Sequence, residues 1–152
     1  MADIAAADVT WSQFHRVVTP QAGSDRKLIQ VNGRITIDPG TTDAYPTGGI
    51  PLTNVFTDFT GIDVTKPIIG QISLVRNNAG VALFIKGYFY NGGTTAATQT
   101  LVLTNIVEGG ATAAIQEVEL ANSDITGANF LGDDDDMICD AIFYGTAVEG
   151  YA

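Results

Sequence analysis

Positive charge is scarce in this chain of 152 residues. Seven lysines and arginines stand against seventeen aspartates and glutamates, which gives a formal net charge of −10 at pH 7. Binding to nucleic acid depends on neutralising phosphates, and binding to anionic lipid surfaces also requires basic residues. The deficit of positive charge therefore argues against nucleic acid and against a membrane as partners.

Long hydrophobic runs and cysteine pairs are missing as well. The longest apolar run, residues 81–85, is far shorter than the roughly 20 residues that a membrane-spanning helix needs. The first eight residues lack the basic start and apolar stretch of a signal peptide. Cys139 is the single cysteine, so the chain cannot form an internal disulfide. We expect synthesis in the reducing cytoplasm of a bacterial host.

Few side chains are available for catalysis. His15 is the one histidine, and it falls in a segment that we expect to be a terminal arm, where a nucleophile and its base would lack rigid support. One histidine and one cysteine cannot supply a tetrahedral zinc site of the usual ligands within one chain. No glycine-rich phosphate motif opens a helix after a strand. We therefore predict a protein that is not an enzyme and has no cofactor.

A run of four aspartates is the one cluster of hard oxygen ligands, the type that calcium prefers. It consists of Asp133, Asp134, Asp135 and Asp136. The contiguous spacing differs from the alternating ligands of a calcium loop, so a solvated acidic loop that also hinders edge-to-edge aggregation is the preferred interpretation. Calcium binding is the alternative.

The residues that are present favour strands. The chain is 45% hydrophobic, only 16% charged, and contains 17 glycines together with many threonines and valines. Its length suits one domain with a single core. We predict an all-β fold: a single antiparallel β-sandwich or barrel (jelly-roll-like) over residues 25–152, preceded by an N-terminal arm over residues 1–24.

The clearest structural signal is a hairpin over residues 68–90, in which two β-rich segments flank a short Asn/Gly turn. Pairing Arg76 with Val81 places one apolar face toward the core. That face consists of Ile68, Ile72, Leu74, Leu83, Ile85 and Phe89. Gly70 and Gly87 leave a gap in it, which a neighbouring strand or a bulky side chain must fill. The other face is mixed, carries Phe84 and Tyr88, and is a candidate subunit interface.

Other strands follow from period-two patterns. We predict strands over residues 100–107 and 137–147, the second with a small-residue apolar face, and one bent strand over residues 27–37. Residues 111–121 fit a strand or a helix, and the strand is preferred.

Two further segments are less regular. Residues 45–52 contain Pro46 and Pro51 and belong at an edge or corner of the sheet. Residues 55–65 form a short strand or a helical turn, with Phe56 and Phe59 in the core.

The expected arm carries a cluster of aromatic and basic residues, Trp11, Phe14, His15 and Arg16. Tryptophan and arginine are favoured anchors at interfaces. The arm either grips a neighbouring subunit through this cluster or packs Trp11 and Phe14 onto its own domain, and the sequence leaves both alternatives open.

The chain contains the segments Val31-Asn-Gly-Arg-Ile-Thr-Ile37 and Tyr45-Pro-Thr-Gly-Gly-Ile-Pro-Leu52. Both are similar to segments of tailed-phage capsid decoration (cement) proteins. The later order of an aromatic hairpin, a Leu-Val-Leu strand and a terminal Phe-Tyr-Gly-Thr strand is also similar, so the resemblance spans roughly residues 28–147. It implies a small β-sandwich or barrel on the outside of an icosahedral head, often trimeric, that clamps capsomers and has no catalytic residues.

We therefore expect a structural virion protein that binds the outer surface of a phage head and stabilises it by bridging major capsid subunits. The expected partners are the major capsid protein and further copies of the chain, as a homotrimer. The candidate contact residues are Trp11, Phe14, His15, Arg16, Tyr45, Thr47, Phe84 and Tyr88. The alternative is a carbohydrate-binding or host-recognition module of a phage fibre or bacterial surface, with Phe84, Tyr88 and Tyr90 as the sugar-facing aromatics.

Overall fold

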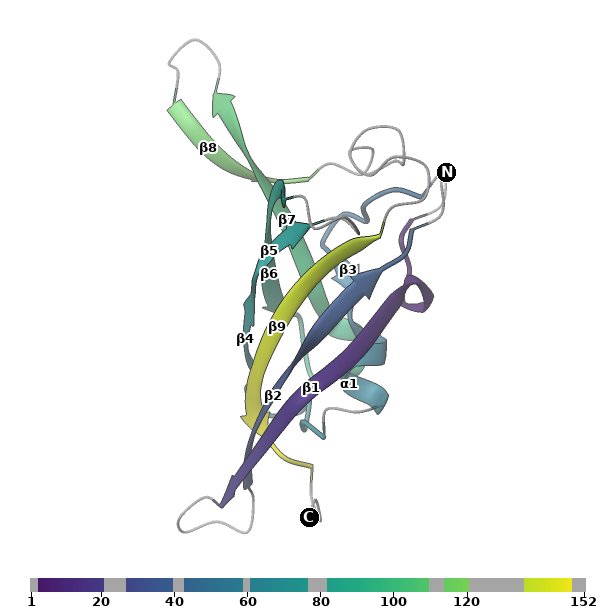
Figure 1. The fold of residues 1–152 in the computed structure, drawn as a ribbon, viewed down its shortest axis with the longest axis vertical. Helices are drawn as coiled ribbons and strands as arrows, with labels where there is room; N and C mark the ends of the chain where they lie inside the picture. The colour runs from purple at the N-terminus through teal and green to yellow at the C-terminus, as the bar shows by residue number, and fades with distance from the viewer. Residues whose placement is uncertain are drawn as a thin grey trace.

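Nine strands of the described residues form one antiparallel sheet that curls into a half-barrel (Figure 1). The computed structural model describes residues 3–20, 27–39, 43–58, 61–76, 82–109, 114–120 and 136–148, with residues 58, 82–84, 106–109, 114–116 and 118 described by their backbone alone. The strands are β1 (Val9–Pro20), β2 (Lys27–Ile37), β3 (Ile50–Pro51), β4 (Ile69–Ile72), β5 (Leu74–Arg76), β6 (Ala82–Asn91), β7 (Gln99–Gly109), β8 (Ala114–Glu119) and β9 (Met137–Thr146). The predicted all-β, antiparallel fold class is confirmed.

The order across the sheet is β1-β2-β9-β5-β6-β7-β3, with β4 also pairing with β9 and β8 pairing with β7. Helical structure among the described residues is limited to α1 (Thr53–Asp58) and two 3₁₀ turns, η1 (Ala6–Asp8) and η2 (Ala96–Thr98). None of it is long and apolar enough to cross a bilayer. Strand β7 pairs with β6 up to Asn105. Beyond that point β7 continues with β8 as a two-stranded ribbon that projects from the body of the sheet (Figure 1).

Strands β2 and β9 lie side by side in the middle of the sheet, and their sequence alternation sets its two faces. Ile29, Val31 and Ile35 of β2 are buried, whereas the alternate positions 30, 32 and 34 are half-buried. In β9 the buried positions are Met137, Cys139, Ala141 and Phe143. The single strand over 27–37 and the apolar face of 137–147 are therefore confirmed. We call the side with the buried residues the inner face and the opposite side the outer face.

Residues 9–20 of the expected N-terminal arm form β1, which pairs with β2 from Val9–Ile37 to Pro20–Lys27. The pairing shifts by one residue between Gln13 and His15, opposite Gly33. A Cβ atom on Gly33 would come within 2.5 Å of the Trp11 ring, so the absence of a side chain lets this ring lie flat on β2. This part of the segment therefore belongs to the sheet.

Four aromatic rings fill the inner face. Phe143 of β9 lies at the centre, with ring centroids 5.0 Å from Phe56 of α1, 5.2 Å from Phe89 of β6 and 5.7 Å from Trp11 of β1. The Phe56 and Phe89 rings are 5.7 Å apart. Tilted and edge-on contacts at these spacings are favourable beyond the area that they bury. The cluster joins both halves of the curled sheet to the helix.

The hairpin register differs from the prediction. Arg76 pairs with Ala82 instead of Val81, and Leu74 pairs with Lys86. Leu74 is 55% exposed whereas Val75 is buried, so placing Leu74 in the core was wrong. The physical reason is Ser73, which interrupts the strand between β4 and β5: its N–H donates to the Asp140 carbonyl and its Oγ accepts from the Asp140 N–H. Inward positions are even-numbered before this break and odd-numbered after it.

The rest of the predicted apolar face holds for the described side chains. Ile68 and Ile85 are buried, and Ile72 and Phe89 pack against the core, while the Leu83 side chain lies outside the described residues. Bulky side chains fill the gap expected at the two glycines. A Cβ on Gly70 would meet Phe89 at 2.7 Å, and one on Gly87 would meet Ile72 at 2.7 Å.

The structure also decides the segments for which the sequence left alternatives. Residues 114–119 are a strand, as preferred. Residues 53–58 form the helix α1, which is the helical one of the two alternatives predicted for residues 55–65; Phe56 is buried, and Phe59 lies outside the described residues. Pro51 lies in β3 at the edge of the sheet, next to a turn in which Gly48 and Gly49 have φ of +91° and +106°. Only glycine adopts these angles without strain.

Replacing Gly70 by alanine tests the aromatic cluster. At a strain-free site this change stabilises by about 0.4–1 kcal/mol, because it restricts the unfolded chain. Here we expect a loss of about 1–3 kcal/mol, because the new methyl group would overlap Phe89 and Phe143. Urea unfolding measures the difference, and Gln71→Ala on the exposed side of the same strand is the control, with a change within about 0.5 kcal/mol. A Gly70→Ala variant as stable as the wild type would contradict the close packing.

Candidate functional site

The outer face of strands β1, β2, β9 and β4 is the candidate site. Val17 lies opposite Gln30, Gln30 opposite Tyr144, and Tyr144 opposite Ile69, so these residues form one row across the four strands. In the adjacent row Thr19 lies opposite Leu28 and Leu28 opposite Thr146. Directly paired residues of antiparallel strands share a face, so the two rows form one continuous surface.

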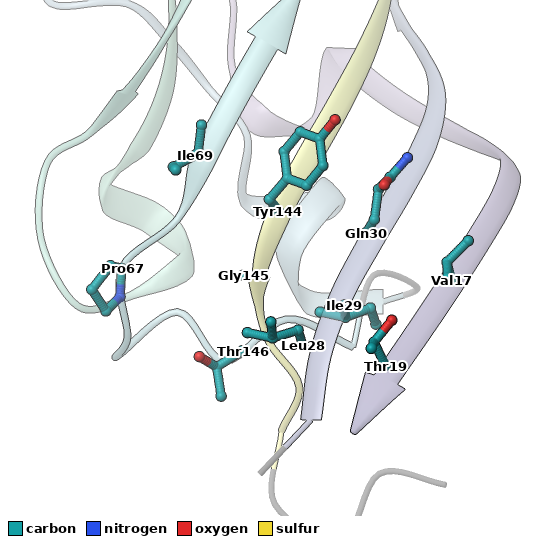
Figure 2. A pocket seen from close by; sticks show the side chains of 10 residues that line it. All are labelled: Val17, Thr19, Leu28, Ile29, Gln30, Pro67, Ile69, Tyr144, Gly145 and Thr146. Carbon is teal, nitrogen blue, oxygen red and sulfur yellow. The ribbon is translucent and has the colours of Figure 1, made fainter. Parts of the chain in front are cut away.

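These rows form an apolar groove of about 470 Å³ (Figure 2). Four large apolar side chains of its lining are solvent-exposed: Val17 to 41%, Leu28 to 46%, Ile69 to 65% and Tyr144 to 37%. Figure 2 shows the Tyr144 ring between Ile69 and Gln30, with Leu28 below it. Among the described residues that line the groove, none carries a charge. We call this surface the apolar groove.

The other end of the outer face carries paired charges. Asp140 accepts a hydrogen bond from Arg34 Nε at 3.0 Å and lies 3.4 Å from an Arg76 guanidinium nitrogen. The Arg34 guanidinium also stacks 5.3 Å from the centre of the Phe14 ring. Partial burial favours the neutral form of Asp140, but the two arginines outweigh it and hold its pKa below the ordinary value. We call these four residues the arginine–aspartate cluster.

A second, shallower groove of about 410 Å³ joins this cluster to the middle of the outer face. Phe14, Asn32, Gln71, Ser73, Asp140 and Ile142 contribute to its lining. The outer face therefore changes along the strands from an uncharged apolar end to a mixed end where aromatic, amide and charged groups alternate.

The sequence-predicted contact residues of β1 divide between the two faces. Trp11 is only 7% exposed and packs within its own domain, which is one of the two alternatives for this segment. Phe14 is 58% exposed and belongs to the arginine–aspartate cluster. His15 is exposed opposite Asn32 on the outer face, and Arg16 is exposed opposite the inward-facing Val31.

The two side chains considered for nucleophilic chemistry point to opposite faces. His15 lies on the outer face, whereas Cys139 is buried on the inner face. Burial raises the pKa of the Cys139 thiol to about 12, so it stays protonated at neutral pH. They do not form a nucleophile–base pair, and Cys139 is the small core residue that its strand position predicted.

Tyr45 holds the edge of the sheet together. Its hydroxyl accepts a hydrogen bond from the buried Leu103 N–H at 3.2 Å and donates to Glu119 Oε1 at 2.8 Å. On this edge β3 pairs with β7 up to Leu101 and β8 pairs from Thr104 onward, so the hydroxyl fills the gap between the two strands. Burial raises the pKa of Tyr45 well above its ordinary value. Tyr45 is therefore structural, and the neighbouring Thr47 is exposed.

Strand β6 carries the other predicted aromatics. Tyr88 is 44% exposed, and its hydroxyl donates to Glu117, which also accepts from Thr104 Oγ1 at 2.6 Å. These hydrogen bonds, first that from Thr104 and then that from Tyr88, lower the pKa of Glu117. Tyr90 is 59% exposed. The Phe84 side chain and residues 133–135 of the calcium candidate lie outside the described residues, which contain no group of three potential metal ligands.

Sequence reasoning missed the apolar groove. Val17, Leu28, Ile69 and Tyr144 come from four different strands, and the strand register brings them together. A partial signal was present, because Leu28 and Tyr144 are large apolar residues at positions where the period of their strands points to solvent.

Comparison with known proteins adds no relative. No protein-family model, no curated protein sequence and no solved structure matches the chain.

Replacing Tyr45 by phenylalanine tests its structural role. The change removes one oxygen atom and leaves the buried Leu103 N–H without its acceptor, which costs about 1–3 kcal/mol of unfolding free energy. Urea unfolding of the purified chain measures the loss. Tyr88→Phe is the matched control, because it also removes a hydroxyl bound to a glutamate but at an exposed position, where water replaces the lost partner. Equal losses in the two variants would refute the structural role.

Proposed function

We propose that this chain is a non-enzymatic structural virion protein that decorates the outer surface of a phage head and stabilises it by bridging major capsid subunits. The observation that carries the proposal is the outer face, where four strands expose apolar, aromatic and paired charged side chains on the side opposite the core. A protein that works by docking requires such a surface. Its expected place is the outside of the capsid, after synthesis in the bacterial cytoplasm.

The resemblance to cement proteins supports the same surface. One of the two resembling segments, residues 31–37, lies in β2 and supplies Asn32, Arg34 and Thr36 at outward positions. The other, residues 45–52, contains Tyr45 and the edge strand β3, which support the fold. Of the two segments that carry the resemblance, residues 31–37 therefore contribute to the proposed docking surface and residues 45–52 support the fold.

Electrostatics support an outward position. A chain with a net charge of −10 is repelled by packaged DNA, so the outer side of the shell suits it better than the inner side. Near the docking face, Arg34 and Arg76 bring positive charge into this acidic molecule and are held in place by Asp140. Paired charges of this kind contribute more to the orientation and selectivity of docking than to affinity.

Bridging explains how a small protein stabilises a large shell. A protein that binds the assembled shell and not its separated subunits shifts the equilibrium toward assembly by mass action. The major capsid protein is the expected partner, and the chain acts as a homotrimer in this proposal. Each copy then presents its own arginine–aspartate cluster to the shell.

A carbohydrate-binding module is the second candidate function. Tyr88 and Tyr90 are both strongly exposed, and their spacing of two residues along β6 places them on one face of the strand. Adjacent exposed aromatic rings of this kind could stack on sugar rings. This candidate predicts binding through β6, whereas decoration predicts binding through the outer face of β1 and β2.

Phe14→Ala tests the decoration proposal. Deleting residues 1–20 would remove β1 from the sheet, so a point variant is the sharper tool. Phe14 is 58% exposed and stacks with Arg34, and its removal should weaken binding to heads purified without the chain by roughly tenfold or more. Titration of labelled chain onto the heads measures the affinity, and melting temperature confirms that the variant is folded.

Tyr90→Ala is the matched control, because its aromatic ring is 59% exposed but lies on β6. Decoration predicts that this variant binds heads as the wild type does. A glycan array with and without a calcium chelator provides the second arm. Loss of glycan binding in Tyr90→Ala, with wild-type behaviour of Phe14→Ala in both assays, would replace the decoration proposal with the carbohydrate-binding one.

A further inference from the structure

The apolar groove concentrates exposed hydrophobic surface. Nine large hydrophobic side chains of the described residues are exposed, and four of them, Val17, Leu28, Ile69 and Tyr144, line this one groove. Scattered exposed apolar residues are normal on a protein surface, but a contiguous group marks an interaction site. Pro67, which is also exposed, contributes further apolar surface to the lining. Burial of such a surface against a partner removes apolar area from water, which is favourable.

We propose that the apolar groove is the surface through which each copy of this chain permanently contacts a second copy within the homotrimer. This inference deepens the proposed function by naming the partner of one half of the outer face, and it rests on that function only for the role of the other half. The arginine–aspartate cluster then remains available to the capsid.

Charge favours a second copy as the occupant. Two chains that each carry a net charge of −10 repel one another, so close association is favoured through surface that brings no negative side chains together. The described lining of the groove meets this condition, because it contains no charged residue of either sign. A basic partner would instead be attracted to an acidic face, and an anionic membrane would need a basic one.

The composition of the two halves of the outer face also separates a permanent contact from a reversible one. Obligate interfaces are more hydrophobic and resemble a core cut in half, whereas interfaces between proteins that also exist apart carry more polar and charged groups. The apolar groove fits the first class. The arginine–aspartate cluster, with its side chains of Arg34 and Asp140 exposed to 41% and 44%, fits the second.

The position of the groove at the edge of the sheet favours a second copy as well. Val17 and Thr19 belong to β1, which is the terminal strand of the sheet and pairs only with β2 among the described strands. A copy that covers the groove therefore also approaches the backbone of an edge strand, where further hydrogen bonds between chains can form.

Ile69→Asp tests this inference on the purified full chain, without phage heads. Sedimentation velocity across a dilution series should give the wild type a mass of at least twice the 16.0 kDa of one chain. The substitution places a charge at the most exposed apolar position of the groove, and we expect the dissociation constant to rise roughly 30-fold or more. Leu74→Asp is the matched control, since Leu74 is also an exposed aliphatic residue but lies outside the groove, and it should associate as the wild type does.

Circular dichroism checks that each variant is folded, and Val17→Asp on the opposite wall replaces Ile69→Asp if that variant unfolds. A wild type that stays monomeric, or an Ile69→Asp variant that associates as the wild type does, would overturn the inference. A monomeric wild type that binds an apolar fluorescent probe in the groove would assign the groove to a small ligand and would overturn it too. A monomeric wild type that still binds phage heads overturns this inference and leaves the decoration proposal intact. A wild type that associates but does not bind phage heads overturns the decoration proposal alone.

Discussion

The ring of Phe143 lies within 5.0–5.7 Å of three other aromatic rings, and these contacts join β9 to β1, β6 and α1. Phe143 of β9 contacts two rings across the inner face, Phe89 of β6 and Phe56 of α1. Gly70 is placed directly opposite Phe143, and its missing side chain leaves the space that the rings occupy. Because side chains alternate between the two faces of a strand, the apolar residues at outward positions of the same strands face away from this core.

Much of the fold was predictable because period-two alternation is strong in its central strands. Residues 27–37 and 137–147 alternate almost without exception, and both strands were predicted. Leu74 was misplaced because a single residue, Ser73, breaks the strand and reverses the inward parity, a tertiary effect fixed by its hydrogen bonds to Asp140. Phe14 and Arg16 could be proposed as contacts from residue type alone. The apolar groove could not, because Val17 and Tyr144 lie 127 positions apart and meet only through β2.

The outer face combines two surfaces with different physical properties. Permanent burial of the apolar groove is favourable because it removes apolar side chains from water. The groove is suited to a second copy of the chain, since its described lining brings no negative charge into the contact. The arginine–aspartate cluster keeps its charges partly hydrated and oriented by Asp140, which suits a partner met after folding. A decoration protein requires both properties, a stable oligomer and a face that recognises an assembled shell. The two halves share strands β1, β2 and β9, with β4 contributing Ile69 to the groove and β5 contributing Arg76 to the cluster.

Hydroxyl-radical footprinting of the full chain tests this division most directly, because it reports the solvent exposure of individual side chains in dilute chain, in concentrated chain and on phage heads. We predict that Ile69 and Tyr144 become protected as the chain is concentrated, and that Phe14 becomes protected only when heads are added. Leu74 and Tyr90 should stay reactive throughout. If Ile69 and Phe14 remained as reactive on heads as in the dilute chain, the outer face would not be a docking surface.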